Sequence, residues 1–313
     1  MAVIQTSGLS KRYRDKWAVD HLDLTVEQGD IYGFIGRNGA GKSTTLKLLC
    51  GLARPTQGEA LIFGKPIRDV VARRRVGALI EQAGLYPDLS GRENLRLYAT
   101  LLGLDSPERQ VEETLETVGL SPKEKKPVKH YSMGMKQRLG VALALLGGPD
   151  LLLLDEPING LDPESVREIR QLIQRLNEAG KTFIISSHIL GELSKLSTHY
   201  GIIKDGNLVE QITREELEQK CVDYFQIEVD DVNRTLPLIT ENMPGIQTEV
   251  CDNATIRLYG LKEASGLNQL LIKSGIQVYS AGFHHMDLED YFLARMDGIR
   301  HEENGNSLAK KCQ

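Results

Sequence analysis

The sequence predicts an α/β fold in which helices cover both faces of a largely parallel sheet. Between residues 31 and 187, short apolar runs of strand length alternate with stretches of helical apolar spacing. The runs at 151–154 and 182–186 are rich in aliphatic residues, which is typical of strands buried on both faces. A glycine-rich turn joins the strand-like run 31–35 to the helix-like run 44–50. We therefore expect a parallel core with its ligand site at that turn.

The glycine-rich turn is a P-loop. Residues 36–43, GRNGAGKS, fit the pattern G-x-x-x-x-G-K-[ST]. Its glycines let successive N–H groups and the positive end of the next helix face a pyrophosphate. Lys42 is expected to reach the β- and γ-phosphates, and the Ser43 hydroxyl to ligate Mg²⁺. The predicted ATP-binding residues are Gly36, Asn38, Gly39, Ala40, Gly41, Lys42, Ser43 and Thr44.

Two adjacent carboxylates end the aliphatic run 151–154. Adjacent carboxylates usually mark a solvated turn, but here an apolar run precedes them and Pro157 follows. Such a run delivers Asp155 and Glu156 to the edge where α/β sheets bind ligands. We expect Asp155 to hold Mg²⁺ through its water shell. Glu156 is expected to polarise a water for in-line attack on the γ-phosphorus.

Smaller parts surround this core. Residues 3–28 contain alternating runs such as 20–26, typical of half-buried antiparallel strands. Residues 91–147 are almost wholly helical in spacing, with breaks at 105–107 and 121–122, and we interpret them as an inserted helical subdomain. The sequence thus adds an antiparallel β subdomain and a helical subdomain to the P-loop core.

The C-terminal part is predicted to be a small α+β module. Its elements follow the order β-α-β-β-α-β of a ferredoxin-like module, with a closing helix at 288–296. The expected elements are 224–229, 232–241, 246–251, 255–259, 262–273 and 276–280. A packing or dimer-supporting role is favoured over ligand sensing. The polar residues 298–313 are expected to be disordered.

Composition limits the class of protein. The net charge of −5 argues against nucleic acid as a partner. The longest uncharged apolar runs, 139–146 and 151–154, are far shorter than the roughly 20 residues that span a bilayer. No segment resembles an export signal, so we expect the cytosol. Four cysteines without metal-ligand spacing are interpreted as reduced thiols: Cys50, Cys221, Cys251 and Cys312.

With these motifs in this order and spacing, residues 1–220 resemble the ATP-binding subunit of an ABC transporter. The resemblance implies an ABC ATPase domain with its helical subdomain at about 88–147, followed by an accessory domain at 221–297. It also implies a separate membrane permease docked through residues 82–94, and hence a place on the inner face of the cell membrane. The alternative is a soluble ABC ATPase of DNA repair or translation. That class more often carries a long coiled-coil insertion or two ATPase cores, and neither is present.

The resemblance assigns roles to five further residues. Tyr13 corresponds to the aromatic residue that stacks on adenine, with Trp17 as the alternative. Gln82 matches the glutamine that contacts Mg²⁺ and the attacking water. His188, after a predicted core strand, matches the histidine that hydrogen-bonds the γ-phosphate. Asp162 matches the acid of the loop that faces a second protomer, and helix capping explains the same residue equally well.

The segment YSMGM completes the resemblance. In the family the corresponding LSGGQ faces the P-loop of the other protomer, so that two chains enclose the ATP. The resemblance implies that here the two chains are identical copies. Ser132 and Gly134 keep the hydroxyl and the close backbone approach. Met133 and Met135 replace a glycine and a glutamine, which leaves the turnover rate open. This form, with residues 86–94, is most similar to bacitracin- and lantibiotic-type self-protection and drug exporters, hence to antibiotic resistance.

Overall fold

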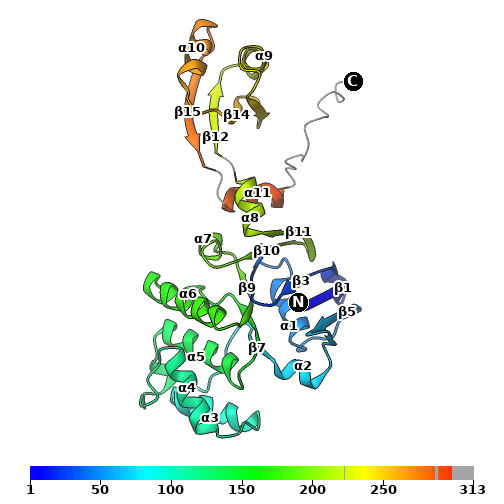
Figure 1. Ribbon diagram of the computed structural model, residues 1–313, viewed down its shortest axis with the longest axis vertical. Coiled ribbons are helices and arrows are strands. Elements are labelled where there is room, and N and C mark those ends of the chain that lie inside the picture. Colours follow the sequence, from blue (N-terminus) through cyan, green and yellow to red (C-terminus); the bar gives the residue numbers. More distant parts are fainter. Residues whose placement is uncertain (222, 286–287, 298–313) are drawn as a thin grey trace. The chain divides into compact units, whose positions relative to one another are not determined.

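The computed structural model describes residues 1–221, 223–285 and 288–297. The chain divides into two compact units, Met1–Arg214 and Glu215–Gln313. Each unit has its own hydrophobic core. Figure 1 labels helices and strands of both units. The tail at 298–313, which the sequence predicts to be disordered, lies outside the described residues.

A six-stranded sheet forms the centre of the first unit, in the order β11-β10-β4-β9-β8-β7. Five of these strands run parallel, and β11 closes the sheet as an antiparallel hairpin with β10. Every residue of β4, β8 and β9 is buried, which confirms the prediction of strands covered on both faces. The strands are β4 (Ile31–Ile35), β7 (Val76–Leu79), β8 (Leu151–Asp155), β9 (Thr182–Ser187), β10 (His199–Lys204) and β11 (Asn207–Thr213).

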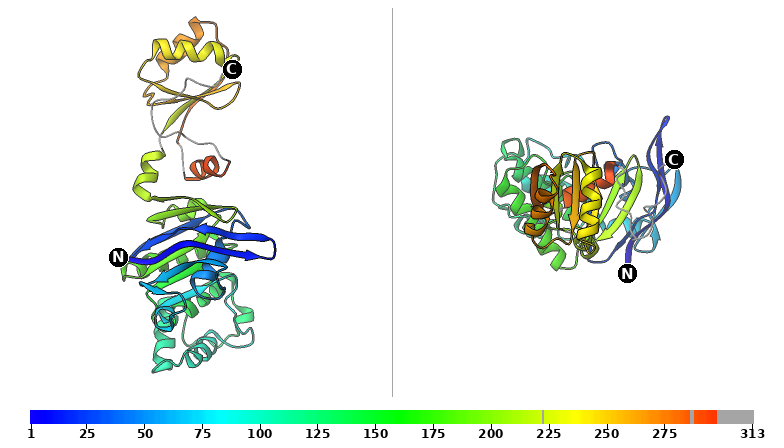
Figure 2. Two further views of the ribbon diagram at one scale, coloured as in Figure 1. Left: turned by 90° about the vertical axis from the view of Figure 1, so that its right-hand side faces the viewer. Right: turned by 90° about the horizontal axis from the view of Figure 1, so that it is seen from above.

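A second, antiparallel sheet contains the N-terminal strands, drawn in blue in Figure 2. Its members are β1 (Ala2–Tyr13), β2 (Lys16–Leu22), β3 (Thr25–Glu27), β5 (Gln57–Ile62) and β6 (Lys65–Pro66). The alternating run 20–26 is two strands rather than one. The break comes at Asp23, whose carboxylate accepts a hydrogen bond from the Gly8 N–H at 2.6 Å. Helix α1 (Lys42–Leu49) packs in the core that the two sheets share.

Helices form the rest of the first unit. The inserted helical subdomain is confirmed, and Figure 1 shows its helices grouped together beyond the parallel sheet. Ser90 begins α3 with a capping box to Glu93, and Asp162 begins α6 by accepting the N–H of Ser165. The helices are α2 (Val70–Arg74), α3 (Gly91–Leu101), α4 (Pro107–Thr117), η1 (Val128–His130), α5 (Met133–Leu145), α6 (Pro163–Glu178) and α7 (Leu190–Leu193).

The second unit has the ferredoxin-like order that the sequence predicts. Its antiparallel sheet runs β13-β14-β12-β15, and buried residues of α9 and α10 share one core with it. The largest differences from the predicted bounds are in the second helix, which begins only at Ser265, and in the last strand, which runs from Val278 to His284. The elements are α8 (Arg214–Lys220), β12 (Tyr224–Val229), α9 (Val232–Asn242), β13 (Gln247–Val250), β14 (Thr255–Tyr259), α10 (Ser265–Lys273), β15 (Val278–His284) and α11 (Leu288–Asp297).

Candidate active site

The carboxyl edge of the parallel sheet gathers the predicted catalytic residues. Strands β4, β9, β8 and β7 are neighbours and run in the same direction, so the segments that follow them leave from one edge. These segments begin with Gly36 after β4, His188 after β9, Glu156 after β8 and Ile80 after β7. Four segments far apart in the sequence therefore meet at one site.

The P-loop is held against its neighbours by its glycines. Gly41 has a φ of +115°, and a Cβ there would lie 2.4 Å from the Ala18 carbonyl oxygen. A Cβ on Gly36 would lie 2.7 Å from the Ile203 carbonyl oxygen. Gly41 also precedes α1 without a capping side chain, which leaves the first-turn N–H groups of that helix available to an anion. The loop thus has the shape and the donors of a phosphate cradle.

Lys42 lies among buried groups at the base of the P-loop. Its side chain is only 6% exposed, and its ammonium donates to the Gly36 carbonyl at 2.6 Å. Glu156 Oε1 lies 3.5 Å from Lys42 Nζ, and Glu156 Oε2 lies 2.7 Å from His188 Nδ1. A buried ammonium needs such a partner because its desolvation is costly. The predicted P-loop lysine, carboxylate and histidine therefore form one connected cluster.

The backbone at Glu156 is strained. Its φ is +50°, a region that residues other than glycine rarely adopt and that costs about 1–3 kcal/mol. The Glu156 N–H compensates by donating to both the carbonyl and the hydroxyl of Ser186, at 3.1 Å each. The turn aims the Glu156 carboxylate at Lys42 and His188. Such strain is typical of functional positions, where the side chain must take one direction.

Asp155 and Ser43 provide oxygen donors that fit Mg²⁺. Asp155 is 5% exposed, and Ser186 Oγ donates to its Oδ1 at 2.5 Å. Ser43 lies in the first turn of α1 and is half-buried. Carboxylate and hydroxyl oxygens, completed by water and substrate phosphate, are the donor set that this ion prefers.

Tyr13 and Gln82 lie on exposed segments near this edge. Tyr13 is 48% exposed at the end of β1, and the Lys11 ammonium lies 4.9 Å from its ring centroid. The Lys47 ammonium on α1 donates to Glu81 Oε1 at 2.5 Å, which holds the residue before Gln82 against that helix. Gln82 is exposed in the loop after β7.

Ser132 and Gly134 contact a different part of the chain. Ser132 is exposed and begins α5 by accepting the Met135 N–H at 3.2 Å. A Cβ on Gly134 would lie 2.3 Å from Ser165 Oγ, and one on Gly160 would lie 2.9 Å from Met133 Cε. The start of α5 therefore packs on the loop 159–162 and on α6. The hydrogen bond of Ser132 and the close approach at Gly134 thus involve α5 and α6, whereas the P-loop cluster joins Lys42, Glu156 and His188.

Asp162 is fully engaged in capping α6. It accepts the N–H of Ser165 and the hydroxyl of Ser165, each at 2.9 Å. These hydrogen bonds hold the pKa of the Asp162 carboxyl below its usual range. The capping role that the sequence offered as one of two is therefore present in the structure.

Two functional serines were missed by sequence reasoning. Ser186 donates to Asp155 and so orients its carboxylate. Ser165 donates its hydroxyl to Asp162 and also lies against Gly134. The signals were a serine pair at the end of an aliphatic run, and a serine three residues after a capping aspartate. Neither signal identifies the partner of the serine. Asp155 is 31 residues away from Ser186 in the sequence, and Ser165 meets Gly134 only when α6 packs on α5.

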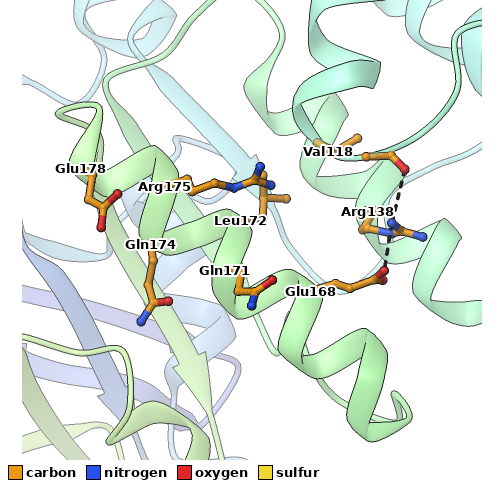
Figure 3. Close-up of a pocket in the computed structure, with 9 residues that line it drawn as sticks. Val118, Arg138, Glu168, Gln171, Leu172, Gln174, Arg175 and Glu178 are labelled. Carbon is orange, nitrogen blue, oxygen red and sulfur yellow. Dashed lines mark hydrogen bonds and ion pairs between the residues drawn. The ribbon is translucent and has the colours of Figure 1, made fainter.

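A cavity of about 410 Å³ lies elsewhere, between the helical subdomain and α6 (Figure 3). Arg138 bridges its two walls, with its Nη1 3.4 Å from both the Gly119 carbonyl and Glu168 Oε2. Among the residues that the structure describes, none accepts a hydrogen bond from the buried Arg138 Nε. The cavity shares no lining residue with the P-loop cluster.

The comparisons with known proteins decide the family. Residues 19–159 match the ABC transporter family. The chain is 42% identical over 302 residues to the bacitracin transport ATP-binding protein BcrA of Bacillus licheniformis, covering 95% of this chain and 98% of that protein. The chain belongs to the ABC transporter family. It is thus an ATP-binding subunit with ATPase activity coupled to transport.

Other members of the ABC transporter family agree. The lantibiotic transport ATP-binding protein SrtF of Streptococcus pyogenes is 39% identical over 209 residues, covering 66% of this chain and 89% of that protein. A dimeric ATP-binding cassette in a post-hydrolysis state, bound to ADP and Pi, superposes with a TM-score of 0.62 at 26% identity. It covers 67% of this chain and 98% of that cassette. In the part of the chain that the structure describes, no helix combines the length and apolarity needed to cross a bilayer.

Proposed function

We propose that the Lys42, Glu156 and His188 cluster is where this ABC ATPase hydrolyses ATP. The observation that supports it most is the pair of contacts from the two Glu156 oxygens to Lys42 and His188. The P-loop N–H groups and Lys42 bind the β- and γ-phosphates. Tyr13, whose ring is exposed at the end of β1, stacks on the adenine.

Each side chain at the edge has a separate task in this proposal. Glu156 takes the proton of the attacking water as general base. His188 holds the Glu156 carboxylate in place and contacts the γ-phosphate, and Gln82 orients the water. Ser43, Gln82 and, through water, Asp155 would hold Mg²⁺, which neutralises charge on the phosphates when bound.

A second copy of the chain completes the site. Ser132 and Gly134 lie at the free N-terminal end of α5, which favours an anion. We infer that they contact the ATP bound to the partner's P-loop, and that the loop with Asp162 lines the same interface. The dimeric state of the similar cassette supports this arrangement.

The transported compound is inferred from the relatives. We propose that the chain energises a separate membrane permease, docked through residues 82–94, and that the complex exports a drug or peptide antibiotic of the bacitracin or lantibiotic type. The chain then works in the cytoplasm, bound to the inner face of the membrane. The relatives named above favour transport over DNA repair or translation.

The decisive test of the catalytic role is Glu156→Gln. ATP hydrolysis is expected to fall by about 100-fold or more because the base is lost. ATP binding should remain, and a stable ATP-bound dimer should accumulate in size-exclusion chromatography because both phosphate cradles survive. Glu116→Gln, an exposed glutamate of α4, is the matched control and should hydrolyse ATP normally. Undiminished hydrolysis by Glu156→Gln would sink the assignment.

Transport is tested in cells. The chain and its neighbouring permease gene, expressed together in a sensitive host, are expected to raise the lowest inhibitory concentration of bacitracin or of a lantibiotic. The same pair with Glu156→Gln should give no protection. Equal protection by both pairs, or protection without the permease, would contradict energised export.

A further inference from the structure

A surface outside the active site combines exposed apolar and cationic side chains. It comprises α2 and the two turns beside it, and we call it the basic-valine patch. Its members are Leu52, Arg54, Lys65, Arg68, Val70, Val71, Arg73 and Arg74, all exposed. Leu52 is 72% exposed, Val70 57% and Val71 61%. The aliphatic part of the Arg73 side chain connects residues 52–54 with α2, since a Cβ on Gly51 would lie 3.2 Å from Arg73 Cδ.

Helix α2 shows one mixed face to solvent. At about 100° per residue, Arg73, Val70, Arg74 and Val71 follow one another around an arc of roughly 160°. Ala72, on the opposite side, is 2% exposed and packs inward. Valines therefore alternate with arginines across a single exposed face, and the helix cannot turn that face inward while Ala72 remains buried.

The charge of the patch is not neutralised. Residues 52–75 contain six Lys or Arg and two Asp or Glu, a net charge of +4 in a chain whose net charge is −5. Within the described residues, Lys65, Arg68, Arg73 and Arg74 form no ion pair. Arg75, just outside the exposed arc, is by contrast paired with Asp150 at 2.6 Å.

The one acid inside the patch already has a structural task. Asp69 begins α2 by accepting the Ala72 N–H at 2.9 Å. That hydrogen bond, followed by nearby Lys65 and Arg73, keeps the pKa of the Asp69 carboxyl below its usual range. Asp69 therefore stays ionised, but its single negative charge offsets only one of the surrounding positive charges, and the patch retains a surplus for an external anion.

We propose that the basic-valine patch binds the anionic lipid surface of the membrane on which the transporter works. Arginines pair with lipid phosphates while the short apolar side chains enter the headgroup boundary, a combination that fits an interface rather than a soluble anion. Nucleic acid fits less well, because the patch has no aromatic side chain on which a base could stack. An acidic segment of the permease is the competing occupant.

The position of the patch agrees with this partner. Strand β7 starts two residues after α2 and leads into the segment 82–94, which we propose as the permease-docking region. The four residues of β7 span roughly 13 Å, so α2 and the start of this segment are separated along the chain by about that length. In Figure 1, α2 and α3 lie at the same end of the first unit. This argument from position rests on the proposed function, whereas the argument from charge and exposure does not.

Co-sedimentation of the purified chain with vesicles, without permease, tests the proposal. The chain is expected to sediment with phosphatidylcholine vesicles that contain phosphatidylglycerol, and not with phosphatidylcholine alone. Higher salt should weaken the binding. The variant R68Q/R73Q/R74Q should lose about 100-fold in affinity, at about fivefold per arginine. V70S/V71S should bind several-fold more weakly while keeping the salt dependence.

A matched variant controls for total charge. R96Q/R109Q/K123Q removes three exposed cations of the helical subdomain and should bind vesicles as the unchanged chain does. ATP hydrolysis of every variant reports on folding and on the proposed active site, and should be unchanged. The proposal is overturned if both triple variants bind equally, or if phosphatidylglycerol makes no difference. Binding that needs permease-containing vesicles and is lost in R68Q/R73Q/R74Q would also overturn it and assign the patch to the permease.

Discussion

Two regions of this cassette are built in opposite ways. We call them the P-loop side, around residues 36–43, and the signature side, around residues 131–135. Lys42 and Asp155, on the P-loop side, are 6% and 5% exposed and are held by Gly36, Glu156 and Ser186. On the signature side, Ser132 is exposed, and the neighbouring Met133 is 56% exposed. The P-loop side keeps its charged groups buried, whereas the other side presents the Ser132 hydroxyl outward and keeps only Gly134 buried against Ser165.

The proposed roles of the two sides account for the difference. In the proposed site, charges that bind the β- and γ-phosphates act most strongly when they are buried and already oriented. In the proposed dimer, a surface that meets and leaves a second copy has to stay accessible. We infer that changes on the P-loop side stop chemistry in each chain, while changes on the signature side act only when two copies meet.

Removal of the buried cation should have the largest effect. In Lys42→Ala, ATP hydrolysis is expected to fall by about 100-fold or more, because the transferring phosphoryl group loses its positive partner and Glu156 is left beside the P-loop uncompensated. The measurement is phosphate release together with equilibrium ATP binding. Lys123→Ala, on an exposed turn, is the control, and a normal ATPase rate in Lys42→Ala would remove the P-loop from the argument.

A methyl group at the signature should act on the dimer alone. In Gly134→Ala the added Cβ would lie 2.3 Å from Ser165 Oγ and displace the start of α6, which Asp162 caps. Hydrolysis should fall by about 10–100-fold while ATP binding to the separated chain is unchanged. Gly191→Ala, where a Cβ would meet nothing within 4 Å, should match the unchanged protein. Reduced ATP binding by separated Gly134→Ala chains would erase the contrast between the two sides.

The orientation of Asp155 should matter through the metal. Ser186→Ala removes the donor to Asp155 Oδ1, and the Mg²⁺ concentration for half-maximal hydrolysis is expected to rise by about tenfold. Ser197→Ala is a matched control, since Ser197 is equally buried and its Oγ has no partner in the described residues. An unchanged Mg²⁺ dependence in Ser186→Ala would mean that Asp155 does not hold the ion.

The smallest effect is expected at Met133. Its methyl group packs on Gly160, so Met133→Ala loosens the link between α5 and the loop before α6. Hydrolysis should fall about twofold, with a change in stability under roughly 0.5 kcal/mol because the side chain is mostly exposed. Met133→Leu should retain the rate. A rate that rises in Met133→Ala would show that this methionine restrains the cycle.

Local patterns in the sequence predicted much of this molecule. The P-loop, the strand that ends in Asp155, and the helix that begins after Asp162 all occur where the sequence places them, because each depends on neighbours within a few residues. The break at Asp23 was missed, since it depends on a hydrogen bond to Gly8, 15 residues away. The roles of Ser186 and Ser165 were missed for a similar reason.

The sequence by itself determined which groups this protein can offer to a nucleotide, and the order of the elements that present them. Only the tertiary structure decided which groups meet. Parallel pairing brings His188 and Glu156 within 2.7 Å, although 32 residues separate them. Packing of α5 on α6 leaves no room for a side chain at Gly134, whereas the sequence shows only that this position has the glycine of the family motif. The physical reason is that side-chain chemistry is local, whereas distance in a folded chain depends on strand pairing and packing.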